Sequence, residues 1–287
     1  MTGSGGPTLT DGHGQDGAAA TCALPADATD GADWAERADA ADGADWAERA
    51  DATDAAVARS ADRQSRRWFA AASAGFVEIV GSCPRDRLTD PALGEWTLRD
   101  LVGHASRAYL TLEDYLEAAR PACAADPSDG RQDSHRTPEP TAGRRPPRLG
   151  SATAYLLAAR SGLADPTAVR DRGRVAGEAL GDNPGQAVAR LAARAVALVA
   201  RTSGDAEVLT PVGRMVLSDY LPTRAFELTV HGLDIARAVG RRPPAALRVA
   251  LRPALHLCAD LLSGDDRMTV LVALTGRAAL PHRSSLV

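Results

Sequence analysis

Apolar residues recur every three or four positions in several long stretches of this chain, and this spacing restricts it to helices that bury one face. The pattern is clearest in one stretch, where a single face carries Leu98, Leu101, Val102, Ala105, Ala108, Tyr109, Leu112 and Leu116. Alanine, leucine and arginine dominate the composition, whereas isoleucine occurs only at positions 79 and 235. This balance favours helices over strands. We therefore expect an all-α fold, arranged as a helical bundle.

Capping residues, glycine and proline mark the boundaries of the helices. Helices are expected over residues 58–82, 98–120, 151–163, 185–201, 218–239 and 244–262, with a short apolar piece at 268–274. Thr97 is the predicted N-cap of the second helix, because Asp100 follows three positions later and can complete a capping box. Ser218 is the predicted N-cap of the helix that ends at Gly240, with Pro222 tolerated in its first turn.

The sequence divides into three parts. Residues 1–57 contain the unit DGADWAERADA twice between positions 30 and 52, and they are acidic with few core-forming side chains. We expect this part to be a disordered, low-complexity tail. Residues 58–240 are expected to form the bundle, interrupted by a long loop over residues 121–150, which are rich in proline, glycine and charge without periodicity. Residues 241–287 form a short C-terminal extension.

Several classes of function are excluded by the composition. The chain has no lysine, which rules out a Walker-type phosphate loop, a kinase and a Schiff base to pyridoxal phosphate. Its arginines are not clustered densely enough to predict nucleic-acid binding. No apolar run approaches the ~18 residues of a membrane helix and no signal-peptide pattern is present, so we expect a cytoplasmic protein that binds no membrane. The four cysteines are far apart without a C-x-x-C motif, which argues against a disulfide framework or a zinc finger.

The predicted helix 218–239 carries a stripe of ionisable side chains at helical spacing: Arg224, Glu227, His231 and Asp234. Part of this stripe is expected to face the bundle, where charges are unfavourable unless they are paired or bind a metal. Glu227 and His231 are one turn apart, so both can reach one cation. His104, at the edge of the apolar face of its own helix, can supply a third ligand across the bundle. Two histidines and a carboxylate are typical of a catalytic site for Zn²⁺ or another divalent ion, although this spacing also occurs by chance.

Two neighbours of this predicted metal site each have two interpretations. Asp234 can orient the His231 ring, or it can pair with an arginine at the surface. Arg224 can meet an anionic substrate, or it can form an ion pair with Glu227, which is the simpler interpretation. The residue types alone do not decide between these roles.

Other polar residues of the predicted helices are assigned more ordinary roles. Tyr220 and Tyr109 can line a pocket, but packing in the core is the default for a tyrosine on an apolar face. Asp100 is expected to cap its helix rather than to bind a metal. His256 lies on an otherwise apolar helix and is expected to be structural.

Three motifs of the chain resemble those of a known family. They are WTLRDLVGH at 96–104, TPVGRMVLSDYLPTR at 210–224 with FELTVHGLDIA at 226–236, and LVALTGR at 271–277. In combination they resemble the mycothiol-dependent maleylpyruvate isomerase family, which is part of the DinB-like superfamily. The resemblance covers about residues 60–287.

This resemblance implies a DinB-like four-helix bundle with a metal centre. In that family the histidine of the first motif and the glutamate and histidine of the second bind a divalent metal, usually zinc, and these positions are His104, Glu227 and His231 here. The resemblance also implies that mycothiol is the cosubstrate and that the metal activates its thiol for attack on a small electrophile. No cysteine of the protein is then needed as the nucleophile.

The expected function is therefore a metal-dependent thiol transferase or isomerase. The isomerase proper of that family has a sizeable C-terminal α/β domain, whereas only the short extension 241–287 follows the bundle here, so S-transfer is at least as well supported as isomerisation. The alternative is a non-catalytic metal-binding module that acts in regulation or partner binding, with the acidic repeat as an interaction arm. A fourth protein ligand would favour the module, and an open coordination position would favour the enzyme. A helical scaffold without a metal would leave Glu227 unexplained.

Overall fold

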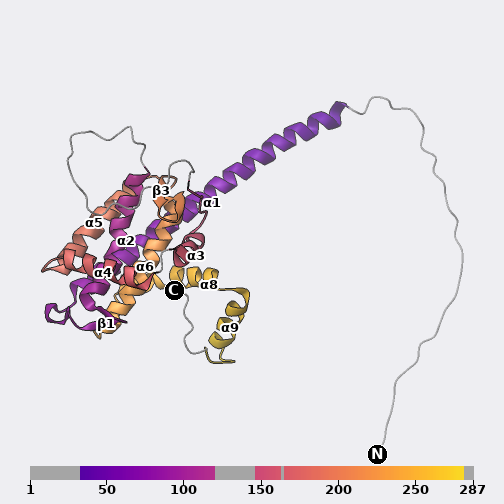
Figure 1. Cartoon of the computed structure of the whole chain (residues 1–287). Coiled ribbons are helices and arrows are strands. Elements are labelled where there is room, and N and C mark those ends of the chain that lie inside the picture. Colours follow the sequence, from indigo (N-terminus) through magenta and orange to yellow (C-terminus); the bar gives the residue numbers. More distant parts are fainter. Residues whose placement is uncertain (1–32, 120–145, 163–164, 281–287) are drawn as a thin grey trace, which may run out of the picture. The chain divides into compact units, whose positions relative to one another are not determined.

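The computed structural model describes residues 33–119, 146–162 and 165–280 of the chain (Figure 1). The chain divides into two compact units, Met1–Asp54 and Ala55–Val287. The described residues are mostly helical, as predicted, with two short antiparallel hairpins in addition. None of these helices combines the length and the apolar character that crossing a membrane requires. Most of the predicted loop 121–150 lies outside the described residues.

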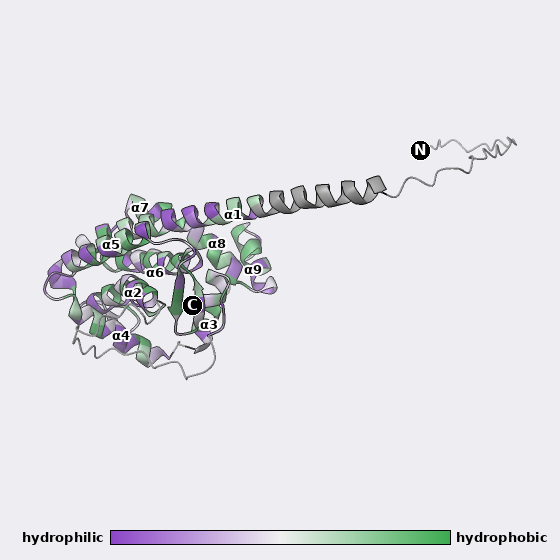
Figure 2. Cartoon of the chain, turned by 90° about the horizontal axis from the view of Figure 1, so that it is seen from above, coloured by the Kyte–Doolittle hydropathy of each residue, from purple (hydrophilic) through white to green (hydrophobic). Residues whose placement is uncertain are grey.

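The elements follow one another as α1 (Asp33–Gly81), a 3-10 turn η1 (Arg85–Arg87), β1 (Pro91–Leu93), β2 (Trp96–Thr97), α2 (Leu98–Ala118), α3 (Ala152–Gly162), α4 (Pro166–Ala179), α5 (Pro184–Arg201), β3 (Glu207–Thr210), β4 (Gly213–Val216), α6 (Leu217–Ala238), α7 (Ala245–Val249), α8 (Leu251–Leu261) and α9 (Gly264–Leu274). Hydrophilic and hydrophobic residues alternate along α4 and α5 in Figure 2, as expected for amphipathic helices that bury one face. The four residues of β3 pair with those of β4 from Glu207 opposite Val216 to Thr210 opposite Gly213.

Helices α2 and α6 pack against each other in antiparallel directions. His104, in the first half of α2, lies beside Glu227 in the middle of α6. Thr111, two turns further along α2, accepts a hydrogen bond from the hydroxyl of Tyr220 near the start of α6. The order of contacts therefore reverses from one helix to the other, and residues that are distant in sequence line one seam.

The core of the second unit forms around Tyr109 of α2. Phe69 and Phe76 of α1 contact its ring edge-on, with centroids 6.2 and 6.3 Å away, and all three side chains are fully buried. Of the two interpretations of Tyr109, core packing is the one that the structure supports.

The start of α2 is the one predicted from the sequence. The Thr97 side chain accepts a hydrogen bond from the Asp100 backbone N–H, and the Asp100 carboxylate accepts one from the Thr97 N–H. This capping box confirms that Asp100 caps the helix. It also fixes where α2 begins, seven residues before His104 counting from Thr97.

The predicted start of α6 is wrong. Ser218 is not the N-cap, because the helix already begins at Leu217. The backbone N–H groups of Leu217 and Ser218 donate instead to the carbonyls of Ala206 and Gly204, so no capping side chain is needed. As a consequence Pro222 lies inside the helix rather than in its first turn.

The boundary of the predicted disordered tail also needs correction. Residues 33–57, which the sequence analysis assigns to the tail, belong to the long helix α1. The repeats are rich in alanine and contain no proline between residues 33 and 57, so their propensity is helical even though they offer few side chains for a core. Residues 1–32 lie outside the described part of the chain.

Three other elements differ from the prediction. Helix α4 and the β3–β4 hairpin were not predicted, because neither shows a clear apolar period. The expected helix 244–262 is divided into α7 and α8, which meet at Ala250. The apolar piece at 268–274 belongs to α9, which has no buried residue.

Helix α4 approaches α2 closely through glycines. A Cβ atom on Gly103 of α2 would lie 2.1 Å from the backbone nitrogen of Gly177, and one on Gly177 would lie 2.7 Å from the carbonyl oxygen of Arg99. A Cβ atom on Gly173 would touch the side chains of Trp96 and His104. Glycine is thus required at this crossing, which brings the α4 backbone over the His104 side chain.

Replacing Gly103 by alanine is expected to lower the free energy of unfolding by about 1–3 kcal/mol, because the added methyl group meets backbone that cannot give way. Gly81→Ala is the matched control, since a Cβ atom there would meet nothing within 4 Å. Urea denaturation followed by circular dichroism measures both. Equal stability of the two variants would contradict the close crossing of α2 and α4.

Deleting residues 1–54 is expected to leave the thermal midpoint of the remaining chain unchanged. These residues form a separate compact unit, and the side chains of residues 52–60 at its junction are all exposed. Calorimetry of the full and the shortened chain provides the comparison. A clear fall of the midpoint on truncation would show that the N-terminal unit packs on the rest.

Candidate metal centre

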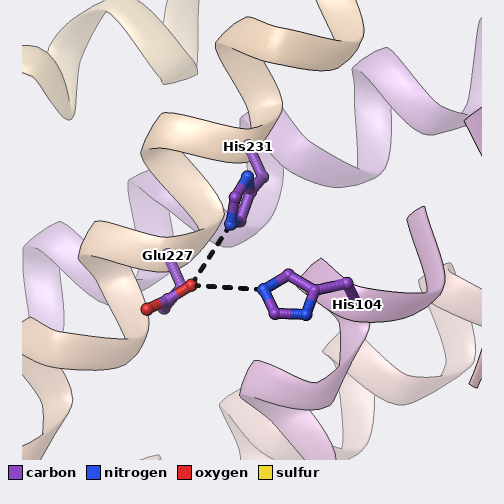
Figure 3. A group of neighbouring side chains, drawn as sticks. All are labelled: His104, Glu227 and His231. Carbon is purple, nitrogen blue, oxygen red and sulfur yellow. Dashed lines mark ion pairs between the residues drawn. The ribbon is translucent and has the colours of Figure 1, made fainter. Parts of the chain in front are cut away.

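Two helices bring together the three side chains singled out in the sequence. His104 projects from α2, and Glu227 and His231 project from successive turns of α6 toward it (Figure 3). One ligand atom from each residue lies within 4.8 Å of the others. All three side chains are partly exposed, by 20% for His104, 30% for Glu227 and 15% for His231, so the cluster is accessible from solvent.

The distances within this cluster suit a shared cation. The Oε2 atom of Glu227 lies 3.4 Å from Nε2 of His231 and 3.9 Å from Nε2 of His104. Two ligands of a tetrahedral zinc ion are about 3.3 Å apart, since each bond is about 2.0–2.1 Å long. The donor set of two imidazoles and one carboxylate is therefore nearly placed for zinc or a similar divalent ion.

Asp234 lies on the far side of the His231 ring. Its Oδ2 atom is 3.2 Å from Nδ1 of His231, three residues earlier on α6. A carboxylate in this position fixes the tautomer with the proton on Nδ1 and leaves Nε2 directed at the cluster. Of the two interpretations of Asp234, the structure supports the one in which it orients the imidazole.

The two histidines have opposite electrostatic environments. Burial lowers the pKa of His104 to about 4, and the charge of His231 lowers it further than Glu227 raises it. Burial also disfavours the charged form of His231, but hydrogen bonds to Asp234 and Glu227 outweigh this and raise its pKa to about 9. Burial raises the pKa of Glu227, but its hydrogen bond to His231 and the positive charges nearby bring it down to about 2. Without a metal, a neutral His104 thus faces an ion pair of Glu227 and His231.

Trp96 covers one side of the cluster. Its ring lies 4.4 Å from that of His104 and 6.5 Å from that of His231, between centroids. The indole Nε1 and His104 Nδ1 are fully enclosed and have no hydrogen-bond partner. Trp96 was not predicted as part of the site, although its place at the head of the first motif is a signal that could have indicated it.

Arg224 forms different contacts from those expected. The simpler interpretation was an ion pair with Glu227, but no such pair is present within 4 Å between these two described residues. The guanidinium donates instead to the hydroxyls of Thr223 and Thr111, at 3.0 and 3.4 Å. Tyr220 is fully buried beside it, so this tyrosine packs in the core and also contacts the Arg224 side chain.

The remaining candidates lie away from the cluster. His256 was expected to have a structural role, but it is exposed on α8, where it lines a groove of about 410 Å³. A larger cavity of about 930 Å³ is lined by α2, α5 and β3, and none of the three cluster residues contributes to it. Burial raises the pKa of Cys83 to about 11 and also raises that of Cys258, so neither thiol ionises readily at neutral pH.

Comparisons of the chain with known protein families, with curated proteins and with solved structures find no match. The resemblance in the three motifs therefore stays a prediction. The geometry of the cluster is independent of it.

The affinity of the chain for Zn²⁺ is expected to rise about tenfold per pH unit between pH 6.5 and 8.5. His231 is protonated below its pKa of about 9, so a metal that binds Nε2 must displace one proton. His104 and Glu227 contribute none, because both have lost their protons in this range. Competition with a chromophoric chelator gives the affinity at each pH. An affinity independent of pH, or a slope of two protons, would contradict this electrostatic arrangement.

Proposed function

We propose that this chain is a metal-dependent enzyme that activates the thiol of mycothiol for transfer to, or isomerisation of, a small electrophile. We further propose that it is a cytoplasmic member of the mycothiol-dependent maleylpyruvate isomerase family, with a DinB-like bundle. The observation that carries this proposal is the convergence of His104, Glu227 and His231 from two facing helices. The same three positions are the ones that the motifs imply.

The residues present fit a catalytic zinc ion. Within the described part of the chain, the cluster has three protein ligands, which leaves a coordination position for a cosubstrate. A zinc ion bound there would lower the pKa of a coordinated thiol, so that the thiolate exists at neutral pH. A non-catalytic module would instead be expected to close the site with a fourth protein ligand.

The side chains around the cluster support this role. Asp234 accepts a hydrogen bond from His231 Nδ1–H and so holds the Nε2 lone pair toward the shared centre. Trp96 packs on His104 and keeps water away from one side of it. The low pKa of His104 leaves its imidazole neutral and available as a ligand at any physiological pH.

The protein's own thiols are poor alternatives as nucleophiles. Cys83 and Cys258 are partly buried, and desolvation raises the pKa of each. A thiol with a raised pKa is almost entirely protonated at pH 7, so little of the nucleophilic thiolate is present. This supports an external thiol as the attacking group. Cys22 and Cys123 lie outside the described residues.

Purified protein is expected to contain zinc and to consume mycothiol in the presence of a suitable electrophile from a panel. His231→Ala should reduce the zinc content and lower the rate of thiol transfer at least about 100-fold, because it removes one of three ligands. His256→Ala, which changes an exposed histidine of α8, is the matched control and should retain both. Zinc is measured by atomic absorption and transfer by loss of free thiol.

Cysteine variants test the source of the sulfur. Cys83→Ser, Cys123→Ser and Cys258→Ser should each retain transfer, since mycothiol supplies the nucleophile. Loss of turnover in one of these variants with zinc still bound would assign the nucleophile to the protein and contradict the proposal.

A further inference from the structure

Arg224 is a buried cation, and no carboxylate of the described residues lies in contact with it. The residue as a whole is only 8% exposed, and the guanidinium carbon lies 4.9 Å from the ring centre of Tyr220 and 5.5 Å from that of Tyr155. A buried charge is strongly unfavourable unless an opposite charge compensates it. The two aromatic rings and the two hydroxyls that accept its hydrogen bonds are neutral, so they offset only part of this cost.

The nearest acidic residue of α6 compensates this charge only at a distance, because Glu227 raises the pKa of Arg224 but forms no ion pair with it within 4 Å. Glu227, one turn further along, directs its carboxylate to His104 and His231. Across the described residues, no carboxylate oxygen lies within 4 Å of the Arg224 nitrogens. A metal at the cluster would engage Glu227 still more fully and leave Arg224 with less compensating charge.

One end of this guanidinium remains able to bind a ligand. Nε and Nη1 donate to the two threonine hydroxyls, whereas Nη2 donates to none of the described residues. Nη2 is also not among the enclosed polar atoms that lack a partner, so it retains contact with solvent. A planar guanidinium with free N–H groups is well suited to bind an oxyanion.

A second arginine adds positive charge at the same place. Arg107 lies one turn beyond His104 on α2, and because α2 and α6 are antiparallel it is on the Arg224 side of the cluster. It forms no ion pair within 4 Å in the described part of the chain. Both arginines act on His104, since each lowers its pKa. Burial lowers the pKa of Arg107, and Arg172 and Arg224 lower it further, whereas Asp114 raises it.

We propose that Arg224, assisted by Arg107, forms an oxyanion subsite beside the metal centre, which binds a carboxylate or phosphate group of the small molecule that reacts there. This inference rests on the proposed function for the identity of the reacting molecule. It narrows the substrate class to electrophiles or thiol adducts that carry an anionic group about one helical turn from the metal. If the proposal is wrong, Arg224 has a purely structural role and only packs against Tyr155 and Tyr220.

Calorimetric titration of the full chain tests the subsite. Sodium succinate and sodium phosphate are titrated separately into zinc-loaded and metal-free protein, with chloride holding the ionic strength constant. The wild type should bind at least one of the two anions, and the preferred anion identifies the group as carboxylate or phosphate. Arg224→Lys keeps the charge but loses the planar fork, so it should weaken binding about tenfold or more. Arg224→Gln should abolish binding, and Arg107→Gln should weaken it.

The matched control is Arg174→Gln, which changes an exposed arginine that pairs with Glu178 on the surface of α4. It should bind the anion as the wild type does. Circular dichroism establishes that each variant is folded, and if Arg224→Gln does not fold, the Arg224→Lys and Arg107→Gln variants decide the outcome. Zinc content is measured in parallel for every variant.

These measurements separate the subsite from the proposed function. A chain that binds zinc, but binds neither anion or binds one equally well in every variant, would overturn the subsite and leave the metal centre intact. A chain that binds no zinc, yet loses anion binding when Arg224 is changed, would overturn the proposed function and support the subsite.

Discussion

The antiparallel packing of α2 against α6 places residues that are far apart in the sequence on one seam, and the candidate site exists only because of it. His104 comes from one helix and Glu227 and His231 from the other, so neither helix alone can hold a cation. The capping box at Thr97 fixes where α2 starts. The backbone hydrogen bonds from Leu217 and Ser218 to the turn before β3 do the same for α6. These contacts thus fix the residue at which each helix begins. They thereby also fix the positions of the site residues along the two helices.

The seam carries charge that an ordinary helix–helix contact avoids. In the metal-free state His231 is balanced by Glu227 and Asp234, and this is reflected in its raised pKa. His104 stays neutral because the same charges and its burial work against protonation. Arg224 differs from both histidines, since the groups in contact with it are neutral hydroxyls and rings and Glu227 acts on it only at a distance. An anionic ligand at Arg224 would add the contact with a negative charge that these neutral groups do not supply.

The parts of the structure that the sequence predicts are those governed by local rules. The spacing of Glu227 and His231 is a property of one helix, and the capping box needs only residues 97–100. His104 was found because an apolar face indicates which side of α2 meets the bundle. Helix α4 was missed because Gly173 and Gly177, which would weaken an isolated helix, are there for close contact with α2. The partners of Arg224 come from α2 and α3 as well as α6, and no pattern within α6 could reveal them.

Helix α6 is continuous from Arg224 through His231, and this fixes the distance along the helix between Arg224 and the proposed metal ligands Glu227 and His231. Glu227 follows Arg224 by three positions, which corresponds to an axial rise of about 4.5 Å. A loop could stretch or shorten that interval as ligands vary, but an unbroken helix cannot. The helix therefore acts as a molecular ruler. A small molecule would be selected by the number of bonds between its reacting atom and its anionic group, even where two candidates have the same charge and the same reactive chemistry.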